Sequence, residues 1–302
     1  MSGRTTGRAK KRGTSKPVKG GRPSSLFFTD KSAWNQKKKS RPSKKKKPGM
    51  LPDWLHWLIT GVALLAVLFL AYLLLLKPYF YRWLPCVGFK EYGTCVPYGY
   101  TYYGIDVSHH QGRIDWQKVA GQSDTKDCPI RFVFMKATEG GTFLDSSFYD
   151  NIAGAREAGF VCGIYHFYNP GTSPRKQAEF YINNVELKKG DLVPVVDVER
   201  SGKSVDALQR ELLDFLSALE SHYGVKPIIY TSAKFRNNIL DKPVFDSYPI
   251  WIAHYYVSHP STDHEWSFWQ FSDHARVEGI NGFTDIDVFK GTPKDFDRLR
   301  MK

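Results

Sequence analysis

Cysteine is scarce in this sequence of 302 residues, with four in all, and none stands in a pattern that binds metal. Neither a CxxC pair nor a cluster of histidine and cysteine at zinc spacing occurs, so no metal site and no cofactor is expected. Cys86 and Cys95 flank a short stretch rich in glycine and aromatic residues, and a disulfide between them would cross-link its two ends. Cys128 and Cys162 each open an apparent strand and would pair if those strands are neighbours. Four free buried thiols are the alternative.

Acidic residues are almost absent from the first 50 positions, which contain 17 lysines and arginines but one acid, Asp30. The rest of the chain has 26 basic and 29 acidic residues, so its net charge is −3, although the whole chain carries +13. The excess positive charge is therefore confined to the tail. Because the tail has few apolar residues to offset the entropy of ordering, we expect it to be disordered.

Charged residues are missing from the long apolar run at 55–76, which reads LHWLITGVALLAVLFLAYLLLL. As an α-helix rising about 1.5 Å per residue, this run would cross a hydrocarbon core of about 30 Å. Aromatic residues stand in or near its two ends, where a membrane interface is expected, namely Trp54, Trp57, Tyr72, Tyr79 and Tyr81. We therefore predict a transmembrane helix. A cleaved signal peptide fits less well, because no small-residue cleavage site follows, and a buried globular helix is rarely so uniformly apolar.

The charge asymmetry around this helix predicts its orientation. Seventeen basic residues precede it, whereas Lys77, Arg82 and Lys90 are the basic residues soon after it. The positive-inside rule then keeps the N-terminus in the cytoplasm and exports residues 78–302, as in a single-pass type II protein of the cytoplasmic membrane. The tail is explained as a topology signal and a contact to anionic lipids, so no nucleic acid is expected as a partner. The expected parts are a disordered cytoplasmic tail (1–53), the transmembrane helix (54–77), an extracytoplasmic spacer (78–101) and a folded domain (102–302).

Short apolar runs rich in Val, Ile, Phe and Tyr recur along the exported part, as expected for strands buried on both faces. The eight runs are 102–108, 130–140, 160–168, 192–199, 226–232, 249–256, 266–272 and 283–289. Helical signals lie between the first six, at 114–120, 146–158, 172–187, 204–223 and 233–240. The later connections look free of helix. This order predicts an α/β fold, an irregular TIM-like barrel of the (β/α)5(β)3 type.

Acidic residues gather at the carboxyl ends of these runs, where β/α barrels carry their catalytic groups. Asp197 and Glu199 are the clearest pair, because residues i and i+2 of a strand share one face, about 6.6 Å apart. Two carboxyl groups in one cleft, one of them with a raised pKa, supply the acid and the carboxylate that glycoside hydrolysis needs. Capping of the next helix, or an ion pair with Arg200, is the structural alternative.

Asp106 and the pair Asp285 and Asp287 extend this acidic pattern to other strands. Turn and hairpin roles are alternatives for each separately, but three acidic strand ends in one barrel mouth indicate a shared site. Aromatic residues suited to stacking on sugar rings, or else to packing of the barrel, are Tyr168, Tyr230, Trp251, Tyr255 and Trp269. Glu139 and Gln270 also stand at strand ends. The histidines His109, His110 and His166 are expected to be structural or peripheral rather than bases.

Eight motifs carry a resemblance to a known family. They are GIDVSHHQG (104–112), FVFMKATEG (132–140), GIYHFY (163–168), VPVVDVE (193–199), PIIYTS (227–232), WIAHY (251–255), and WQFS with TDIDVF near the C-terminus. In this order they resemble glycoside hydrolase family 25, the Chalaropsis-type lysozymes or N-acetylmuramidases. The resemblance covers about residues 102–292 and leaves out the tail, the membrane helix and the spacer.

The resemblance implies cleavage of the β-1,4 bond between N-acetylmuramic acid and N-acetylglucosamine, with retention of configuration. By motif, Glu199 would be the general acid and Asp197 its partner, while Asp106 and Asp285 would complete the acidic cluster. Asp287 stands where many members have asparagine and is grouped with the substrate-binding residues. Asp197 would either attack directly or orient the 2-acetamido group of the substrate as an internal nucleophile.

We therefore predict a membrane-anchored lysozyme that cleaves peptidoglycan strands near the outer face of the cytoplasmic membrane, for wall remodelling or turnover. The alternative is an inactive tether that binds peptidoglycan without cleaving it. Retention of all four carboxylates favours the enzyme, because a binding module has no need for a desolvated acid pair.

Overall fold

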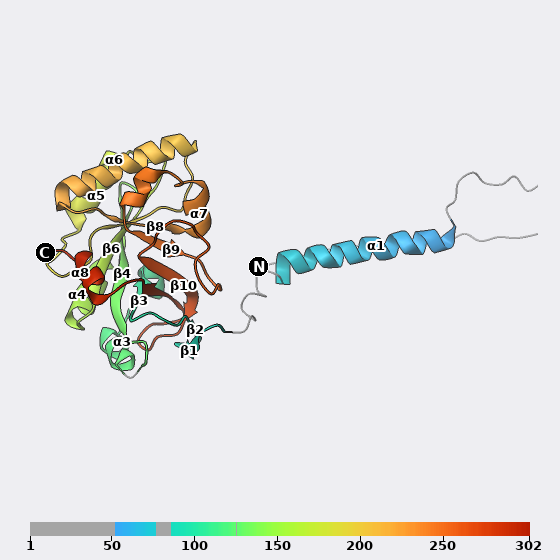
Figure 1. Cartoon of the computed structure of the whole chain (residues 1–302), viewed down its shortest axis with the longest axis horizontal. Coiled ribbons are helices and arrows are strands. Elements are labelled where there is room, and N and C mark those ends of the chain that lie inside the picture. The colour runs from blue at the N-terminus through green and yellow to red at the C-terminus, as the bar shows by residue number, and fades with distance from the viewer. Residues whose placement is uncertain (1–51, 77–85, 125) are drawn as a thin grey trace, which may run out of the picture. The chain divides into compact units, whose positions relative to one another are not determined.

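The computed structural model describes residues 52–76, 86–124 and 126–302 of the chain. The predicted disordered tail, apart from its last two positions, lies outside these residues, as do Tyr79 and Tyr81. The described residues form a long N-terminal helix and a barrel (Figure 1).

The N-terminal helix coincides with the predicted transmembrane segment. Helix α1 runs over Asp53–Ala71 and continues as the π-helical turn η1 at Tyr72–Leu76. An 18-residue window within Asp53–Leu75 has a mean hydropathy of 2.7, and none of the residues of α1 is buried. By length and composition this helix is able to cross a membrane.

A closed barrel forms the rest of the described chain. Its strands are β3 (Tyr102–Val107), β4 (Ile130–Glu139), β6 (Val161–Phe167), β7 (Val195–Asp197), β8 (Ile228–Ser232), β9 (Ile250–Ala253), β10 (Phe268–Ala275) and β11 (Thr284–Phe289). They pair in the order β3-β11-β10-β9-β8-β7-β6-β4, and a β3–β4 pairing closes the ring, while the short β5 (Phe143–Leu144) pairs with the end of β4. Each strand coincides with one of the predicted runs, so the predicted barrel is confirmed.

The direction of the last strand differs from a regular β/α barrel. Strand β11 is antiparallel to both β10 and β3, whereas the other neighbours in the ring are parallel. The start of β11, rather than its end, therefore lies at the same rim as the carboxyl ends of the other strands.

The two faces of each strand pack into different cores. Side chains that point into the barrel, such as Phe132, Phe134 and Phe268, form one cluster, and the outward residues pack against the helices in a second, larger cluster. The interior is crowded by aromatic rings, and two glycines make room for them. A Cβ atom on Gly104 would lie 2.2 Å from the ring of Phe132, and one on Gly163 would lie 2.2 Å from the ring of Phe134.

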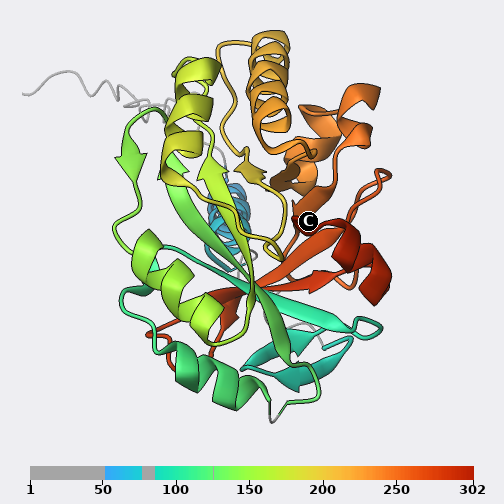
Figure 2. The same cartoon turned by 90° about the vertical axis from the view of Figure 1, so that its left-hand side faces the viewer.

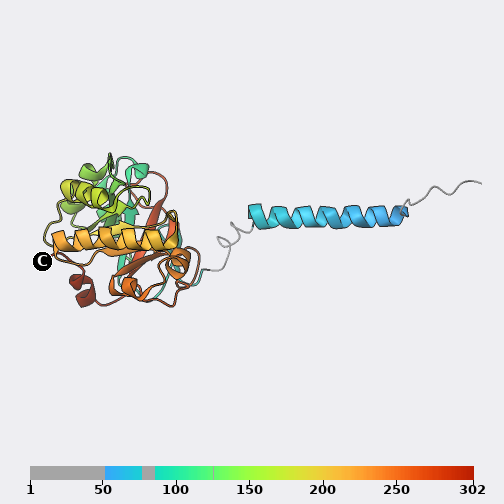
Figure 3. The same ribbon diagram turned by 90° about the horizontal axis from the view of Figure 1, so that it is seen from above.

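Helices cover the outside of the parallel strands at each of the five predicted positions (Figure 2). They are α3 (Trp116–Ser123), α4 (Phe148–Glu157), α5 (Pro174–Asn184), α6 (Val205–Tyr223) and α7 (Ala233–Asn238). The long helix α6 lies along the barrel in Figure 3. Its first turn is capped by the Ser204 side chain, its apolar stripe is buried, and Gly224 ends it in the left-handed conformation. Short helices that were not predicted are η3 (His109–Gln111), η4 (Pro243–Ser247) and α8 (Pro293–Arg298).

A hairpin in the expected spacer packs on the barrel at strand β10. Strands β1 (Phe89–Glu91) and β2 (Thr94–Val96) are joined by Tyr92 and Gly93, both with positive φ. The Thr94 hydroxyl donates to the Ser272 hydroxyl at 2.9 Å, and the Arg276 amide donates to the Tyr92 carbonyl at 2.7 Å. Tyr92 and Val96 are buried in the outer core. Residues from 86 onward are therefore part of the folded domain, and the expectation of a spacer up to residue 101 is wrong there.

The disulfide predictions have opposite outcomes. Cys86 and Cys95 are bonded, which ties the hairpin at its base. Cys128 and Cys162 are both free and buried, so the second pairing is wrong. The strands β4 and β6 are neighbours as expected, but Cys162 lies opposite Val133, and Cys128 precedes that residue by five positions. At about 3.3 Å per residue the two thiols are far too distant to bond.

Candidate active site

A cavity of about 220 Å³ opens at the rim of the barrel, and we call it the acidic cavity. Each of the eight barrel strands, or the residue just after it, contributes to its lining. Its lining residues are Asp106, Ser108, His110, Lys136, Tyr165, Phe167, Asp197, Glu199, Tyr230, Trp251, Tyr255, Gln270 and Asp285. The four predicted catalytic carboxylates are all among them, so strands that are distant in sequence bring these groups together.

Asp106 and Asp285 lie directly opposite each other on the antiparallel strands β3 and β11. Asp285 is the second residue of β11, so the strand reversal places it at the rim, and not a carboxyl-terminal position as predicted. Burial and the carboxyl groups of Asp285 and Asp287 raise the pKa of Asp106 well above its usual value. Burial, and then Asp273, raise the pKa of Asp285 to about 7. This pair therefore retains a proton near neutral pH.

Gln270 holds Asp106 in a defined orientation. Its amide nitrogen donates to Asp106 Oδ2 at 2.6 Å, and its amide oxygen accepts from the hydroxyls of Tyr230 and Tyr255 at 2.7 and 2.6 Å. The two donors to the oxygen fix the orientation of the amide, so that the nitrogen faces the carboxylate. Tyr230 and Tyr255, two of the three tyrosines predicted to contact sugar, thus also belong to the polar network of the cavity.

Asp197 and Glu199 reach the cavity from the end of β7. The extended backbone is held beyond the strand, because the Val198 amide donates to the Tyr230 carbonyl and the Thr231 hydroxyl donates to the Val198 carbonyl. Burial, and then Glu199, raise the pKa of Asp197 well above its usual value. Partial burial also raises the pKa of Glu199, whose side chain reaches solvent.

Neither structural alternative for the pair Asp197 and Glu199 holds. The helix that follows begins at Val205 and is capped by Ser204. Arg200 forms its ion pair with Glu139, at 3.2 Å. Both carboxyl groups of the Asp-x-Glu motif are therefore left for the cavity.

Trp251 lines the base of the acidic cavity, and Asp287 is its hydrogen-bond partner. The Trp251 ring stacks on Phe134, and its Nε1 donates to Asp287 Oδ1 at 2.8 Å. Asp287 is fully buried and does not line the cavity, so it is positioned to orient Trp251 rather than to meet a substrate as predicted. Burial and Asp285 raise the pKa of Asp287 well above its usual value.

Lys136, Tyr165 and Phe167 are cavity residues that were not predicted, and so is Ser108. Lys136 donates to Glu139 at 2.6 Å and lies over the Phe167 ring. The alternation along the strands could have identified the first three of these residues. Lys136 lies two positions after the inward residue Phe134, and Tyr165 and Phe167 lie two and four positions after Gly163, so they face the same side of the sheet. A lysine in the middle of the run IRFVFMKATE was itself an indication of an unusual environment.

Two predicted stacking residues, Tyr168 and Trp269, lie outside the cavity. Tyr168 is fully buried against Phe215 of α6, and Trp269 is fully buried with its Nε1 donating to the His254 carbonyl at 2.8 Å. Each adjoins an inward residue in the chain, Phe167 or Gln270, and therefore faces outward. These two residues pack the barrel, which was the alternative given for them.

The histidines are held in structural contacts, with one exception. His166 is buried between Thr138 and Gln177, and burial lowers its pKa to about 4. His109 binds Asp145 at 2.6 Å. His110 lines the acidic cavity beside Ser108.

Comparisons with known proteins agree with this geometry. Residues 105–280, more than half of the chain, match the family described as glycosyl hydrolases family 25. The uncharacterized protein YegX of Escherichia coli is 41% identical over 219 residues, which cover 72% of this chain and 79% of that protein. The autolytic lysozyme of Clostridium acetobutylicum is 34% identical over 187 residues, which cover 62% of this chain and 55% of that protein. The structure of a family 25 glycosyl hydrolase from Bacillus anthracis matches with a TM-score of 0.60 and 31% identity, over 67% of this chain and 94% of that one.

Proposed function

The chain belongs to glycoside hydrolase family 25, and we propose that it is a membrane-anchored muramidase whose general acid is Glu199. As a member of this family it is a glycoside hydrolase of the muramidase type that acts on peptidoglycan. The observation that supports these catalytic roles is that one cavity brings together the four carboxyl groups of Asp106, Asp197, Glu199 and Asp285.

Glu199 is suited to protonate the leaving oxygen of the glycosidic bond. Its raised pKa keeps part of the population protonated above the usual range of a glutamic acid, and its side chain reaches solvent, where a glycan strand would enter. A general acid of this kind accelerates a reaction by about 10²- to 10⁴-fold.

Asp197 lies two residues earlier on the same strand end and is proposed as the partner of Glu199. As the bond breaks, positive charge develops at the anomeric carbon, and carboxylates nearby stabilise it. Asp197 then acts by direct attack or by orienting the 2-acetamido group, and either route retains the configuration. Asp106 and Asp285 complete the cluster. Tyr230, Trp251 and Tyr255 are proposed to contact the sugar from the base and side of the cavity.

The location is proposed from the N-terminal part of the chain. The exposed apolar helix at Asp53–Leu75 follows a tail with 17 basic residues and one acid, which favours a cytoplasmic N-terminus and an exported barrel. Held in this way, the enzyme would act on wall close to the membrane, in local remodelling or turnover.

The test uses the full-length chain, purified in detergent and incubated with purified peptidoglycan. Glu199→Gln removes the proposed acid, and Glu157→Gln, an exposed position on α4, is the matched control. Products are reduced with borohydride and identified by mass spectrometry. We expect muramitol ends from the wild type and from Glu157→Gln, and at least a hundredfold fewer from Glu199→Gln. Intact glycan in every sample would instead indicate a tether, and glucosaminitol ends would indicate cleavage of the other glycosidic bond.

A further inference from the structure

A second cavity, of about 570 Å³, adjoins the acidic cavity and shares Glu199 and Tyr255 with it. We call it the side chamber. Its lining comes from the end of β8, from α7, and from the end of β9 with the loop that follows. Its other lining residues are Ser232, Ala233, Lys234, Asn237, Asn238, Ala253, His254 and Ser261.

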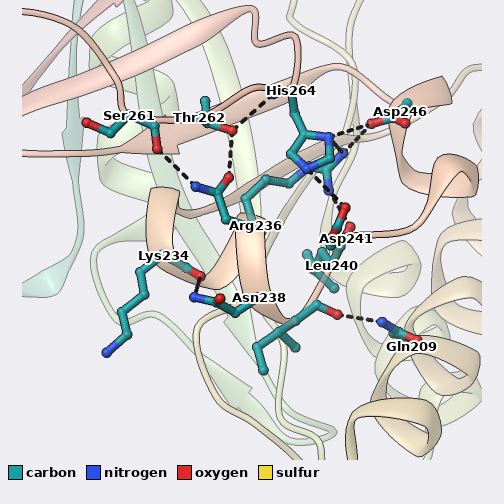
Figure 4. Close-up of polar contacts among 12 residues, drawn as sticks. Gln209, Lys234, Arg236, Asn238, Leu240, Asp241, Asp246, Ser261, Thr262 and His264 are labelled. Atoms are coloured by element: carbon teal, nitrogen blue, oxygen red, sulfur yellow. Dashed lines mark hydrogen bonds and ion pairs between the residues drawn. The ribbon is translucent and has the colours of Figure 1, made fainter.

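The chemistry of the side chamber differs from that of the acidic cavity. Glu199 is the one carboxylate among its lining residues, and the others are residues with hydroxyl or amide groups, two alanines, a histidine and a lysine. The ammonium group of Lys234 has no hydrogen bond or ion pair with any residue in the described part of the chain. Figure 4 shows its side chain extending away from the polar contacts of α7. The ammonium group of Lys234 is therefore unpaired among the described residues, at a cavity whose only other charged lining side chain is Glu199.

Hydrogen bonds between its own residues hold the outer wall of the side chamber. Asn237 donates to the Ser261 carbonyl at 3.0 Å and accepts from the Thr262 hydroxyl at 2.7 Å. The Ser261 amide donates to His254 Nδ1 at 3.0 Å. These contacts hold the loop 254–264 against α7, so the cavity does not need to form on binding.

A buried arginine supports this wall from behind. Arg236 is fully buried and donates to the Leu240 carbonyl and to Asp246, while His264 lies within 3.0 Å of it (Figure 4). The amide of Gln209, on α6, donates to the Ile239 carbonyl at 2.5 Å and fixes the end of α7. Helix α7, which carries Lys234, is therefore a fixed element of the chamber.

The position of Glu199 determines which half of a substrate each cavity receives. A general acid must contact the oxygen of the scissile bond, so this oxygen lies where the two cavities meet. Positive charge develops on the sugar that keeps the anomeric carbon, and Asp197, Asp106 and Asp285 suit that sugar to the acidic cavity. The side chamber is then left for the departing half of the glycan.

We propose that the side chamber binds the departing half of the glycan strand and that Lys234 binds a carboxylate of the stem peptide attached to it. The inference rests on the proposed role of Glu199. In peptidoglycan cleaved by a muramidase, the departing half begins with N-acetylglucosamine, followed by a muramic acid whose lactyl group bears an acidic peptide. Neutral hydroxyls and amides suit the sugar, and a flexible point charge suits a carboxylate on a mobile peptide. Lys234 is thus assigned as a specificity-determining residue for peptide-bearing glycan.

The experiment compares two substrates, peptidoglycan with its stem peptides and the same glycan after an amidase has removed them. The full-length chain in detergent is assayed as wild type, as Lys234→Gln and as Lys294→Gln, which is a control on α8 outside both cavities. For each protein, kcat/KM is measured from the release of reducing ends. We expect the wild type to prefer peptide-bearing glycan, and Lys234→Gln to lower this preference about fivefold through KM, the loss expected for one partly solvated ion pair. Lys234→Glu should lower it further by repulsion.

Other outcomes would overturn the inference in distinguishable ways. If Lys234→Gln keeps the wild-type preference, or lowers kcat/KM equally on both substrates, then Lys234 does not recognise the peptide. If the wild type cleaves neither glycan, the proposed function fails and this inference with it. Activity on both glycans without any preference would leave the muramidase intact and remove only the role of the side chamber.

Discussion

The acidic cavity and the side chamber meet at Glu199 and differ in both charge and construction. The acidic cavity is formed by the ends of barrel strands, whose backbone pairing fixes Asp106, Asp197 and Asp285 within a small space. The side chamber is formed by a short helix and a loop, and its positive charge is Lys234. Rigid strand ends suit the chemical step, which needs exact placement, whereas a helix and a loop suit recognition of a variable substrate. Variants on the two sides should therefore change different kinetic constants.

The largest effect is expected from Asp197→Asn, which removes a carboxylate without changing the shape of the side chain. We expect kcat to fall about 10²- to 10³-fold with little change in KM, because the lost charge acts mainly in the transition state. Steady-state kinetics on peptide-bearing glycan would measure this. Asp150→Asn, at an exposed position on α4, is the control and should match the wild type. A kcat within a few-fold of the wild type would remove Asp197 from the chemical step.

Ionisation of Asp285 in the acidic cavity should lower the free energy of unfolding at high pH. The pKa of Asp285 is raised to about 7, so the folded state binds a proton that the unfolded state has released above its usual range near 4. The free energy of unfolding therefore falls as the pH rises from about 4, and it stops falling above about pH 7. Asp285→Asn should stabilise the barrel by about 4 kcal/mol at pH 8 and by little at pH 4.

Unfolding of the full-length chain in detergent, followed by tryptophan fluorescence at both pH values, would check the Asp285 prediction. Lys234→Gln is the comparison from the side chamber and should change stability little at either pH, because Lys234 is exposed. Equal curves for the wild type and Asp285→Asn at pH 8 would contradict the proposed burial of a charge.

A smaller change in stability, in this case a loss, is expected from Trp251→Phe at the base of the acidic cavity. Trp251→Phe keeps the stacking on Phe134 but removes the donor to the fully buried Asp287. An unsatisfied buried carboxyl oxygen should cost about 1–3 kcal/mol in the free energy of unfolding. Trp266→Phe, at a partly exposed position with no side-chain hydrogen bond among the described residues, is the control. Equal losses for the two variants would mean that the hydrogen bond contributes nothing beyond ring packing.

The sequence predicted the barrel and the acidic cluster because both depend on local patterns. Apolar runs with helical segments between them identify the strands, and acids at the run ends identify the rim. The direction of β11 has no such local signal, and Asp285 reached the rim through the reversal of that strand. Tyr168 and Trp269 were misassigned because neighbouring residues of a strand face opposite sides of the sheet. The end of an apolar run does not show which of its residues face the inside of the barrel.

The side chamber was not predicted at all, for a different physical reason. Its wall depends on contacts between Asn237 and residues more than twenty positions later, in the loop at 254–264. Loops carry no periodic pattern that reveals what they pack against. The buried Arg236 looks like any surface arginine of a short helix until Asp246 and His264 are placed beside it. Recognition surfaces built from loops are therefore harder to predict than catalytic groups on strands.

The smallest effect is expected from Asn237→Ala, which detaches the loop from α7 without touching a charge. Losing two hydrogen bonds at a solvent-accessible wall should raise KM for peptide-bearing glycan about threefold and leave kcat within about twofold, because the chamber then has to order on binding. Asn184→Ala is the matched control, since among the described residues the side-chain amide of Asn184 bonds only within its own helix, α5. The KM on glycan without peptides should rise less than on peptide-bearing glycan, since fewer contacts then depend on the wall. A fall in kcat with KM unchanged would instead show that the wall positions Glu199, and the two cavities would then act as one site.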